Sequence, residues 1–243
     1  MFEKLNNLYL KQRFFPNIVS ILINPFYFNR KALLSAIKSN AKEAKGDLLD
    51  FGCGAKPYKS LFKNTSSYVG VDIENESHNH QGEEIDFYYD GKVLPFTNES
   101  FDIVFSSEVL EHVPNLYKSL SEIERVVKEN GLVLMTIPFT FAEHEMPYDY
   151  RRFTKNGIVE ILDEFGFETI KKSTYGTYIE VISQLIILYV HDLIYTKNKY
   201  FNIILNSIFI FPLTLFGMIL STVLPNNKSL YFGTVILAKK KRK

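Results

Sequence analysis

Short apolar runs, each closed by an acidic or a turn-forming residue, succeed one another through the middle of this 243-residue chain. Runs of this length, rich in β-branched and aromatic residues, predict strands. A later β-rich run precedes the basic C-terminus. This order is typical of βαβ units in an α/β protein. Strands are therefore expected at residues 47–50, 68–73, 85–90, 100–107, 132–137, 167–173 and 229–238.

The first of these runs ends in Asp50 and then enters a two-glycine turn, Gly52-Cys53-Gly54. Glycine permits positive φ and lets a ligand approach the backbone, so such a turn indicates a nucleotide-sized cofactor. A carboxylate beside it would repel the pyrophosphate of a dinucleotide but attract the sulfonium and ammonium groups of S-adenosylmethionine. Cys53 is expected to be a small buried side chain there.

Two further acids end the next strands. Asp72 lies 22 residues after Asp50, where an acid accepts hydrogen bonds from ribose hydroxyls. A simple strand-end turn is the alternative for Asp72 alone. Asp90 ends the third strand, where its carboxylate can accept a hydrogen bond from the adenine amino group.

The ordered segments are Asp50-Phe51-Gly52-Cys53-Gly54, Val71-Asp72, Leu94-Pro95-Phe96, Phe101-Asp102-Ile103-Val104, Leu110-Glu111-His112-Val113 and Gly131-Leu132-Val133-Leu134. Together they resemble the signature of class I S-adenosylmethionine-dependent methyltransferases over roughly residues 46 to 172. Ala55 departs from the family, many of whose members carry a further glycine at this place.

The resemblance implies an α/β, Rossmann-like, seven-stranded sheet with a final antiparallel strand and helices on both faces. It places the methionine moiety at Gly52 and Gly54, the ribose at Asp72 and the adenine at Asp90. The cofactor site it implies also includes these neighbours: Asp50, Cys53, Ile73, Gly91, Ser106 and Glu108.

Composition sets broad limits. The formal net charge is +1 and the catalytic half has no basic stripe interleaved with aromatics, so no nucleic-acid partner is expected. The single cysteine excludes an internal disulfide and suits a reducing cytosol. The first five residues lack the pattern of a secretory signal, so a cytoplasmic location is expected.

Residues 203–224 carry no charge over 22 positions, a length sufficient to cross a bilayer. Four parts are expected: an N-terminal helical cap (1–45), a cofactor-binding core (46–177), an apolar helical insertion (178–228) and the last strand with a basic tail (229–243). Because both ends of the insertion join one sheet, an even number of membrane passes or none is required.

Pro212 favours a kinked or broken helix in this insertion. A helical hairpin that contacts the cytosolic face of a membrane through 178–224 is therefore expected, with the basic tail binding anionic lipid. The alternative is a lid or a homodimer interface in a soluble protein. Asn29 is expected to cap an N-terminal helix that ends near Glu43.

The loop after the fifth strand is expected to face the methyl acceptor, since α/β sheets bind ligands beyond the carboxyl ends of their strands. His144 is the first candidate for a general base and His112 the second. Asp149 and Arg152 either orient the acceptor or pair with each other, and Thr154 is expected to cap the next helix. His78 and His80 are two apart without a third ligand, so no metal is predicted.

Two classes of function remain open. The first is an O-methyltransferase for a glycan, glycolipid or other lipid-linked acceptor, with a quinone or fatty-acyl acceptor as the second choice. The other is a non-catalytic binding module built on the methyltransferase fold. The acid-glycine turn and the two later acids favour cofactor binding, because a scaffold has no electrostatic need for them.

Overall fold

The computed structural model describes residues 12–73 and 85–242, and the chain divides into two compact units. The core unit comprises Ile37–Thr174 and Gly233–Lys243, and the helical unit comprises Met1–Ala36 and Tyr175–Phe232. The apolar segment after residue 177 therefore shares a unit with the described part of the N-terminal segment up to Ala36.

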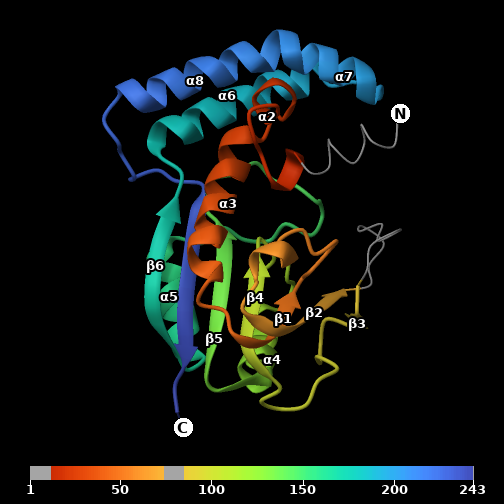
Figure 1. Cartoon of the computed structure of the whole chain (residues 1–243), viewed down its shortest axis with the longest axis vertical. Coiled ribbons are helices and arrows are strands. Elements are labelled where there is room, and N and C mark those ends of the chain that lie inside the picture. Colours follow the sequence, from red (N-terminus) through yellow and green to blue (C-terminus); the bar gives the residue numbers. More distant parts are fainter. Residues whose placement is uncertain (1–11, 74–84, 243) are drawn as a thin grey trace. The chain divides into compact units, whose positions relative to one another are not determined.

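The core unit contains a seven-stranded sheet in the order β3-β2-β1-β4-β5-β7-β6 (Figure 1). The pairs β1 with β2, β1 with β4, β2 with β3, and β4 with β5 are parallel, whereas β7 runs antiparallel to β5. The expected class I sheet with its final antiparallel strand is confirmed. The strands are β1 (Gly46–Phe51), β2 (Thr65–Ile73), β3 (Phe87–Tyr89), β4 (Phe101–Ser107), β5 (Val127–Pro138), β6 (Phe167–Tyr175) and β7 (Gly233–Lys240).

Several strand limits differ from those predicted. β5 begins at Val127, five residues before the expected start, and β2 begins at Thr65 rather than at residue 68. Apart from Val127 and Gly131 the added residues are polar or charged, so hydrophobic patterning did not include them. β3 keeps only three of six expected residues, and β7 begins at Gly233 instead of Ser229.

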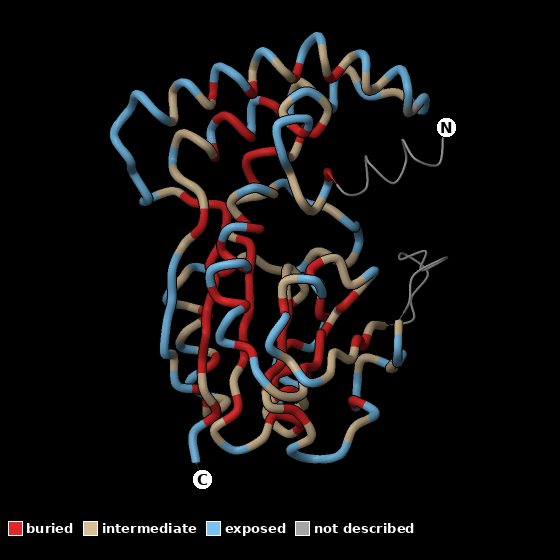
Figure 2. Tube along the Cα trace, viewed as in Figure 1, coloured by how far each residue is buried: buried red, intermediate tan, exposed pale blue. Residues whose placement is uncertain are grey.

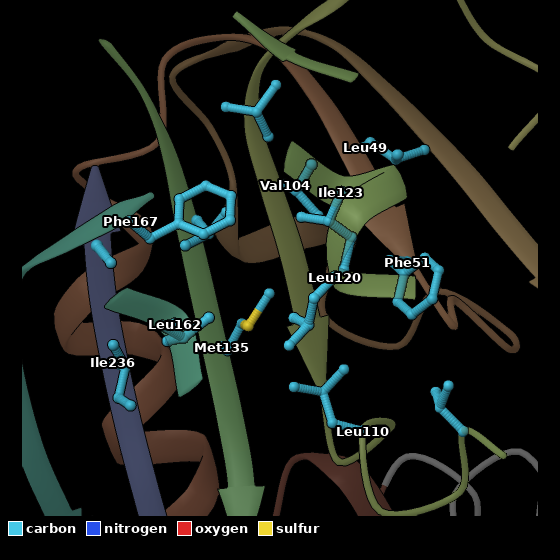
Figure 3. Close-up of a cluster of buried hydrophobic side chains, with 14 of the residues drawn as sticks. Leu49, Phe51, Val104, Leu110, Leu120, Ile123, Met135, Leu162, Phe167 and Ile236 are labelled. Atoms are coloured by element: carbon cyan, nitrogen blue, oxygen red, sulfur yellow. The ribbon is translucent and has the colours of Figure 1, made fainter. Parts of the chain in front are cut away.

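Helices α4 (Leu116–Val126) and α5 (Lys155–Glu164) pack on one face of this sheet (Figure 3). Leu120 and Ile123 of α4 lie over β1 and β4, and Leu162 of α5 lies near β5 and β7. Each fully buried aliphatic side chain contributes about 1.5–3 kcal/mol through removal of apolar surface from water. In Figure 2 the buried residues, drawn in red, follow the strands of this sheet.

Local hydrogen bonds fix where these helices begin and end. Asn115 caps α4 by accepting from the Lys118 amide at 3.1 Å, and Thr154 caps α5 by accepting from the Gly157 amide at 3.1 Å, as expected. At the other end of α4, the buried Lys240 ammonium donates to the Glu124 and Val127 carbonyls at 2.7 and 2.9 Å.

The opposite face of the sheet is covered in part by the segment that follows the glycine turn. The rings of Tyr58 and Phe62 lie 6.3 and 4.7 Å from the ring of Phe105 in β4. The short helical turn η1 (Lys59–Leu61) lies between them. These aromatic contacts tie the end of the glycine turn to the centre of the sheet.

The helical unit contains α2 (Ser20–Ile23), the first part of α3 (Tyr27–Ala41), α6 (Tyr178–Ile194), α7 (Lys199–Leu205), η2 (Asn206–Ile210) and α8 (Phe211–Val223). Helices α6 and α8 pack against each other (Figure 1). Their close approach requires Gly217, where a Cβ would lie 2.6 Å from the Ser183 hydroxyl. Thr177 and Glu180 form a capping box at the start of α6.

The expected cap at Asn29 is wrong. Helix α3 begins at Tyr27, and Asn29 lies inside it, buried, with its backbone amide 3.3 Å from the Gln184 side-chain oxygen. Two aromatic residues precede Asn29 in the sequence, and their burial in the helical unit extends the helix beyond the polar start signal.

Residues Tyr200–Val223 form one continuous helix of 24 residues, and only 22% of its most apolar window is buried. Within the described residues this is the one helix long and apolar enough to cross a membrane. Of the kink or break expected at Pro212, the break is absent: the helix continues, with the π-helical turn η2 directly before the proline. Proline has no amide hydrogen to donate, so one backbone hydrogen bond of the helix is absent there. A wider turn tolerates this absence without ending the helix.

Candidate active site

The glycine turn lies directly after β1, and both glycines have positive φ. Gly52 has φ +73°, and a Cβ there would meet both Val109 methyls at 2.5 Å. Gly54 has φ +44°, and a Cβ there would meet nothing within 4 Å. The first glycine therefore permits close packing against the segment after β4, whereas the second borders open space that a ligand can enter.

Asp72, at the end of β2, is hydrogen-bonded to this turn. One carboxylate oxygen accepts from the Gly54 amide at 2.7 Å, and the other accepts from the Ile73 amide at 2.7 Å. A carboxylate oxygen keeps a further lone pair after one such bond, so both oxygens can still accept from ribose hydroxyls. The ribose role of Asp72 remains a prediction with suitable geometry.

Asp50 lies buried at the end of β1, and the Tyr68 hydroxyl donates to its carboxylate at 2.5 Å. Burial raises the pKa of Asp50 to about 7, with Asp72 adding to the rise and the Tyr68 hydrogen bond opposing it. A nearby cation favours the ionised form of such a group. The site therefore fits a positively charged, phosphate-free ligand such as S-adenosylmethionine.

Lys56 and Asp86 complete this edge of the site, and neither was predicted. The Lys56 ammonium and the Gly70 amide both donate to one oxygen of Asp86 at 2.6 Å. Although its partial burial acts in the opposite direction, these bonds lower the pKa of Asp86. The only signal in the sequence was an acid at the start of the third predicted strand.

Asp90 and Gly91 follow β3. Asp90 is exposed, and its Oδ1 accepts from the Lys92 and Val93 amides at 2.9 and 3.3 Å, bonds that lower its pKa. This oxygen therefore closes a turn, which leaves Oδ2 for the predicted bond to adenine. Gly91 lies beside Ile73, whose Cδ1 would be 3.2 Å from a Cβ at this glycine.

Ser106 and Glu108 lie at the end of β4, as expected for residues that border a ligand. Ser106 is buried, and its hydroxyl finds no hydrogen-bond partner among the described residues. Glu108 has φ +57°, an uncommon value for a non-glycine residue that concentrates at functional positions. Its amide donates to the Thr136 carbonyl at 3.0 Å, which holds this conformation.

Cys53 is buried, as predicted. Burial, supported by the charges of Asp50 and Asp72, raises the pKa of its thiol. A thiol with a raised pKa stays protonated at neutral pH and is a poor nucleophile. Cys53 therefore acts as a small side chain under the turn.

The loop after β5 docks onto the segment after β4 through backbone atoms. The Tyr150 amide donates to the Glu111 carbonyl at 2.9 Å, and the Arg151 guanidinium donates to the carbonyls of Val113 and Pro114 at 2.5 and 2.9 Å. These bonds join positions nearly forty residues apart in sequence. They bring together the two histidines that the sequence selected.

His112 and His144 are direct neighbours. Their Nε2 atoms lie 3.2 Å apart, with ring centroids 4.7 Å apart and rings at 90°. The Nδ1 atom of His112 faces the Tyr148 carbonyl at 3.1 Å, and that of His144 faces the Ala142 carbonyl at 3.2 Å. Burial and the charge of His112 lower the pKa of His144, so its imidazole is neutral at pH 7.

Asp149 and Arg152 pair with each other, which is the structural role left open by the sequence. Arg152 donates to both carboxylate oxygens of Asp149, at 2.5 and 2.6 Å, and these bonds overcome burial to lower the pKa of Asp149 to about 2. Asp149 also accepts from the His144 amide at 3.0 Å. The pair holds the loop around His144.

Glu111 was quoted only as part of a sequence motif, yet its side chain is completely buried beside His112. Burial and the negative charge of Glu108 raise the pKa of Glu111 well above its usual range. The sequence signal was an acidic residue between Leu110 and His112 in that motif. His78 and His80, on which the expectation of no metal was based, lie outside the described residues.

Comparisons with known proteins agree with this geometry. Residues 49–135 match the sequence model of the methyltransferase domain family. An uncharacterized protein of Methanocaldococcus jannaschii is 28% identical over 162 residues, which is 64% of this chain and 70% of that protein. An uncharacterized methyltransferase of Mycobacterium tuberculosis is 27% identical over 146 residues, 56% of this chain and 57% of that protein.

A solved S-adenosylmethionine-dependent methyltransferase of Thermotoga maritima shares the fold. It superposes with a TM-score of 0.54 at 17% identity and covers 99% of this chain and 98% of its own. The matched residues 49–135 include the glycine turn, Asp72, β4 and most of β5. Residues 49–135 therefore correspond to a methyltransferase domain, and the chain has the fold of a solved S-adenosylmethionine-dependent methyltransferase.

Proposed function

We propose that this chain transfers a methyl group from S-adenosylmethionine to a hydroxyl of a glycan, glycolipid or other lipid-linked acceptor at the cytosolic face of a membrane. In this reaction the sulfur–methyl bond breaks and its electron pair stays on sulfur. A new oxygen–methyl bond forms as the hydroxyl gives up its proton. The products are a methyl ether, S-adenosylhomocysteine and one proton.

The core unit supplies alignment for this displacement. Gly52, Gly54 and Asp72 are the residues we assign to the cofactor, and Asp50 supplies negative charge beneath it. Holding the acceptor oxygen in line with the methyl group replaces a bimolecular encounter by a positioned one. The acceptor oxygen belongs at the His112–His144 pair, because both histidines follow strands at the carboxyl edge of the sheet.

The membrane part of the proposal rests on one observation: the helical unit exposes many large apolar side chains. A contiguous apolar surface of this kind marks a protein or lipid contact. Most of the exposed side chains belong to the continuous helix and to α6. They include Ile182, Ile186, Tyr189, Leu193, Phe201, Ile204, Ile208, Phe216, Ile219 and Val223.

The chain connections limit how this surface meets a bilayer. Helix α6 follows β6 and α8 precedes β7, and these two strands are neighbours in one sheet. A single crossing would separate β7 from its partners, so we infer contact within one leaflet or at the interface. The basic tail contributes less than expected, because Lys240 is buried and Lys241 pairs with Asp163 at 2.6 Å.

A vesicle flotation experiment tests the membrane part. Full-length protein is mixed with anionic phospholipid vesicles, alone and with the double substitution Phe216→Ser and Ile219→Ser on the exposed side of α8. Wild-type protein should float with the vesicles, and the double variant should bind less. Val93→Ser with Tyr117→Ser is the matched control, because both side chains are as exposed but lie on the core unit.

Recovery of wild-type protein wholly in the soluble fraction would remove the membrane part. A dimer that dissociates in the Phe216→Ser, Ile219→Ser variant, measured by sedimentation, would instead assign the same surface to a second copy of the chain. The acceptor is identified by mass spectrometry of lipids and surface glycans from cells with and without the protein.

A quinone or fatty-acyl acceptor is a second candidate, and one observation favours it. Asp149 accepts from Arg152 at both carboxylate oxygens and also from the His144 amide, so its carboxylate offers little hydrogen bonding to a sugar. An apolar acceptor needs fewer such partners and suits the helical unit equally well. A non-catalytic module is separated from both by cofactor binding, which calorimetry measures directly.

A further inference from the structure

Three side chains in the core unit converge without an evident reason in methyl transfer alone. Glu111 and His112 follow β4, and His144 lies in the loop after β5. One ligand atom from each side chain lies within 4.8 Å of the other two. Two imidazoles and one carboxylate are a common ligand set for divalent metals.

The hydrogen bonds of both histidines direct their Nε2 lone pairs toward each other. A ring nitrogen that faces a backbone carbonyl must carry the proton, and Nδ1 does so in His112 and in His144. The Nε2 atoms, 3.2 Å apart, are then both acceptors in the neutral rings. Two facing lone pairs repel each other unless a proton or a cation lies between them.

The distance of 3.2 Å between the two Nε2 atoms suits a metal bound by both. Two nitrogens bound to one ion at about 2.1 Å, with an angle of about 100° between them, are about 3.2 Å apart. Nε2 of His112 is 3.7 Å from Oε1 of Glu111, slightly longer than the spacing of neighbouring ligands.

Glu111 provides the independent observation. Its side chain is 0% exposed, and neither carboxylate oxygen has a hydrogen-bond partner among the described residues. A buried carboxylate without a partner is costly, and native structures pair such groups or use them to coordinate metals. Oε1 of Glu111 lies 3.7 Å from Nε2 of His112, and a ligand atom of His144 lies within 4.8 Å of the Glu111 carboxylate.

A supporting shell surrounds the three side chains. Asp149 Oδ2 lies 3.3 Å from Nδ1 of His144, and Arg152 holds that carboxylate in place. The Tyr148 carbonyl orients His112 in the same way. Carboxylate and carbonyl acceptors behind a histidine ligand fix its tautomer and ring orientation in metal sites.

We propose that Glu111, His112 and His144 bind one divalent first-row transition-metal ion, of the class of Mn²⁺ or Zn²⁺. Imidazole ligands favour these ions over Mg²⁺ and Ca²⁺, which prefer oxygen. Three protein ligands leave coordination positions open. We assign one of these open coordination positions to the acceptor hydroxyl, an assignment that rests on the proposed function.

This assignment changes the role predicted for His144. An Nε2 lone pair that binds a metal cannot take the acceptor's proton, so His144 becomes a ligand instead of a base. A metal-bound hydroxyl loses its proton far more readily than a free one. The acceptor oxygen then attacks the methyl group as a metal-bound alkoxide, and the proton passes to water.

Metal binding is measured directly on the full chain, without reference to activity. Protein stripped with a chelator is titrated with Mn²⁺ or Zn²⁺ by calorimetry, and elemental analysis after desalting counts the bound ion. We expect one ion per chain and a rise in melting temperature. Glu111→Gln and His144→Ala should each weaken binding by roughly 100-fold. His191→Ala is the control, since His191 lies in the helical unit beside Asp192.

The alternative is that a proton, not a metal, lies between the Nε2 atoms of His112 and His144. In that case the metal titration gives a different result. Folded wild-type protein that binds neither ion at about 1 mM, with no change in melting temperature, would overturn the proposal. So would Glu111→Gln and His144→Ala variants that fold and bind metal like wild type. Circular dichroism verifies folding, and Glu111→Gln keeps the shape of the side chain if His144→Ala does not fold.

The metal proposal and the proposed function fail separately. S-adenosylmethionine binding is titrated on the same stripped protein, so its absence contradicts the methyltransferase assignment whatever the metal does. Once an acceptor is known, methyl transfer that is unchanged after chelation would overturn the role in the reaction. Loss on chelation, with recovery by Mn²⁺ or Zn²⁺, would support it.

Discussion

Two parts of the proposed site in the core unit are built in different ways. We call the glycine turn with Asp72 and Asp86 the cofactor end, and the loops that carry His112, His144 and Arg152 the acceptor end. At the cofactor end, backbone amides of Gly54, Ile73 and Gly70 donate to Asp72 and Asp86. At the acceptor end, imidazole, carboxylate and guanidinium side chains contact one another across two loops. The first end is therefore held largely by backbone hydrogen bonds, whereas the second is held by contacts between side chains.

Asp50→Asn should give the largest effect and tests how far the burial of Asp50 outweighs the nearby charge of Lys56 when no ligand is bound. Because burial raises the pKa of Asp50 to about 7, its contribution to stability is complete below about pH 4 and is lost as pH rises through 7. The loss amounts to at most about 4 kcal/mol.

Free Asp50→Asn protein should therefore be more stable than wild type at pH 8 and similar to it at pH 4, as measured by urea unfolding. Its affinity for S-adenosylmethionine should fall, because the attraction to the cationic cofactor is gone. Tyr68→Phe is the comparison variant, since it removes the hydrogen bond but keeps the charge. Equal stability of Asp50→Asn and wild type across this pH range would contradict the electrostatic account.

Arg152→Ala tests the acceptor end. It leaves the almost fully buried Asp149 carboxylate without its cation, which costs about 3 kcal/mol of unfolding free energy. Cofactor affinity should stay within a few-fold of wild type, since no contact of Arg152 involves the glycine turn or Asp72. A large loss of cofactor affinity in the folded variant would show that the two ends are coupled.

Gly52→Ala should weaken cofactor binding through a local steric effect. The added methyl strains a positive φ by about 1–2 kcal/mol and collides with Val109. Gly166→Ala measures the strain at positive φ alone, because Gly166 has φ +78° and open space around its Cβ position. Similar losses of stability in the two variants, measured by thermal unfolding, would mean that contact with Val109 is unimportant.

Ile219→Ser should have the smallest effect on folding and extends the comparison to the helical unit. The side chain is 51% exposed, so its loss should change the unfolding free energy by less than about 0.5 kcal/mol. Val104→Ser in the core is the contrasting change, since Val104 is completely buried. A destabilisation of Ile219→Ser comparable to that of Val104→Ser would indicate that this face is packed in solution.

The sequence predicted the cofactor end well because its signals are local. An acid and two glycines after a strand fix the position of the turn, and Asp72 follows at the spacing that a βαβ unit sets. Strand limits were less predictable, since β5 begins at Val127, which pairs with Phe101 of β4 before an irregularity in register that contains the polar residues Lys128 to Asn130.

The acceptor end was predictable only in part. His112 and His144 were selected for their side-chain chemistry, but nothing local indicates that Arg151 would dock one loop on the other. Glu111 was named only as part of the motif Leu110-Glu111-His112-Val113, because nothing local distinguishes a buried carboxylate from an exposed one. Long-range packing decided that it is buried, and no periodicity in a single sequence carries that information.

Titration of the chelator-treated full chain with S-adenosylmethionine by calorimetry tests the central claim most directly. The account predicts binding to one site per chain that does not require metal, because backbone amides and Asp72 build the cofactor end. Asp72→Ala should weaken binding at least about tenfold, a loss of about 1.4 kcal/mol. No heat and no thermal shift at about 1 mM cofactor would contradict the account.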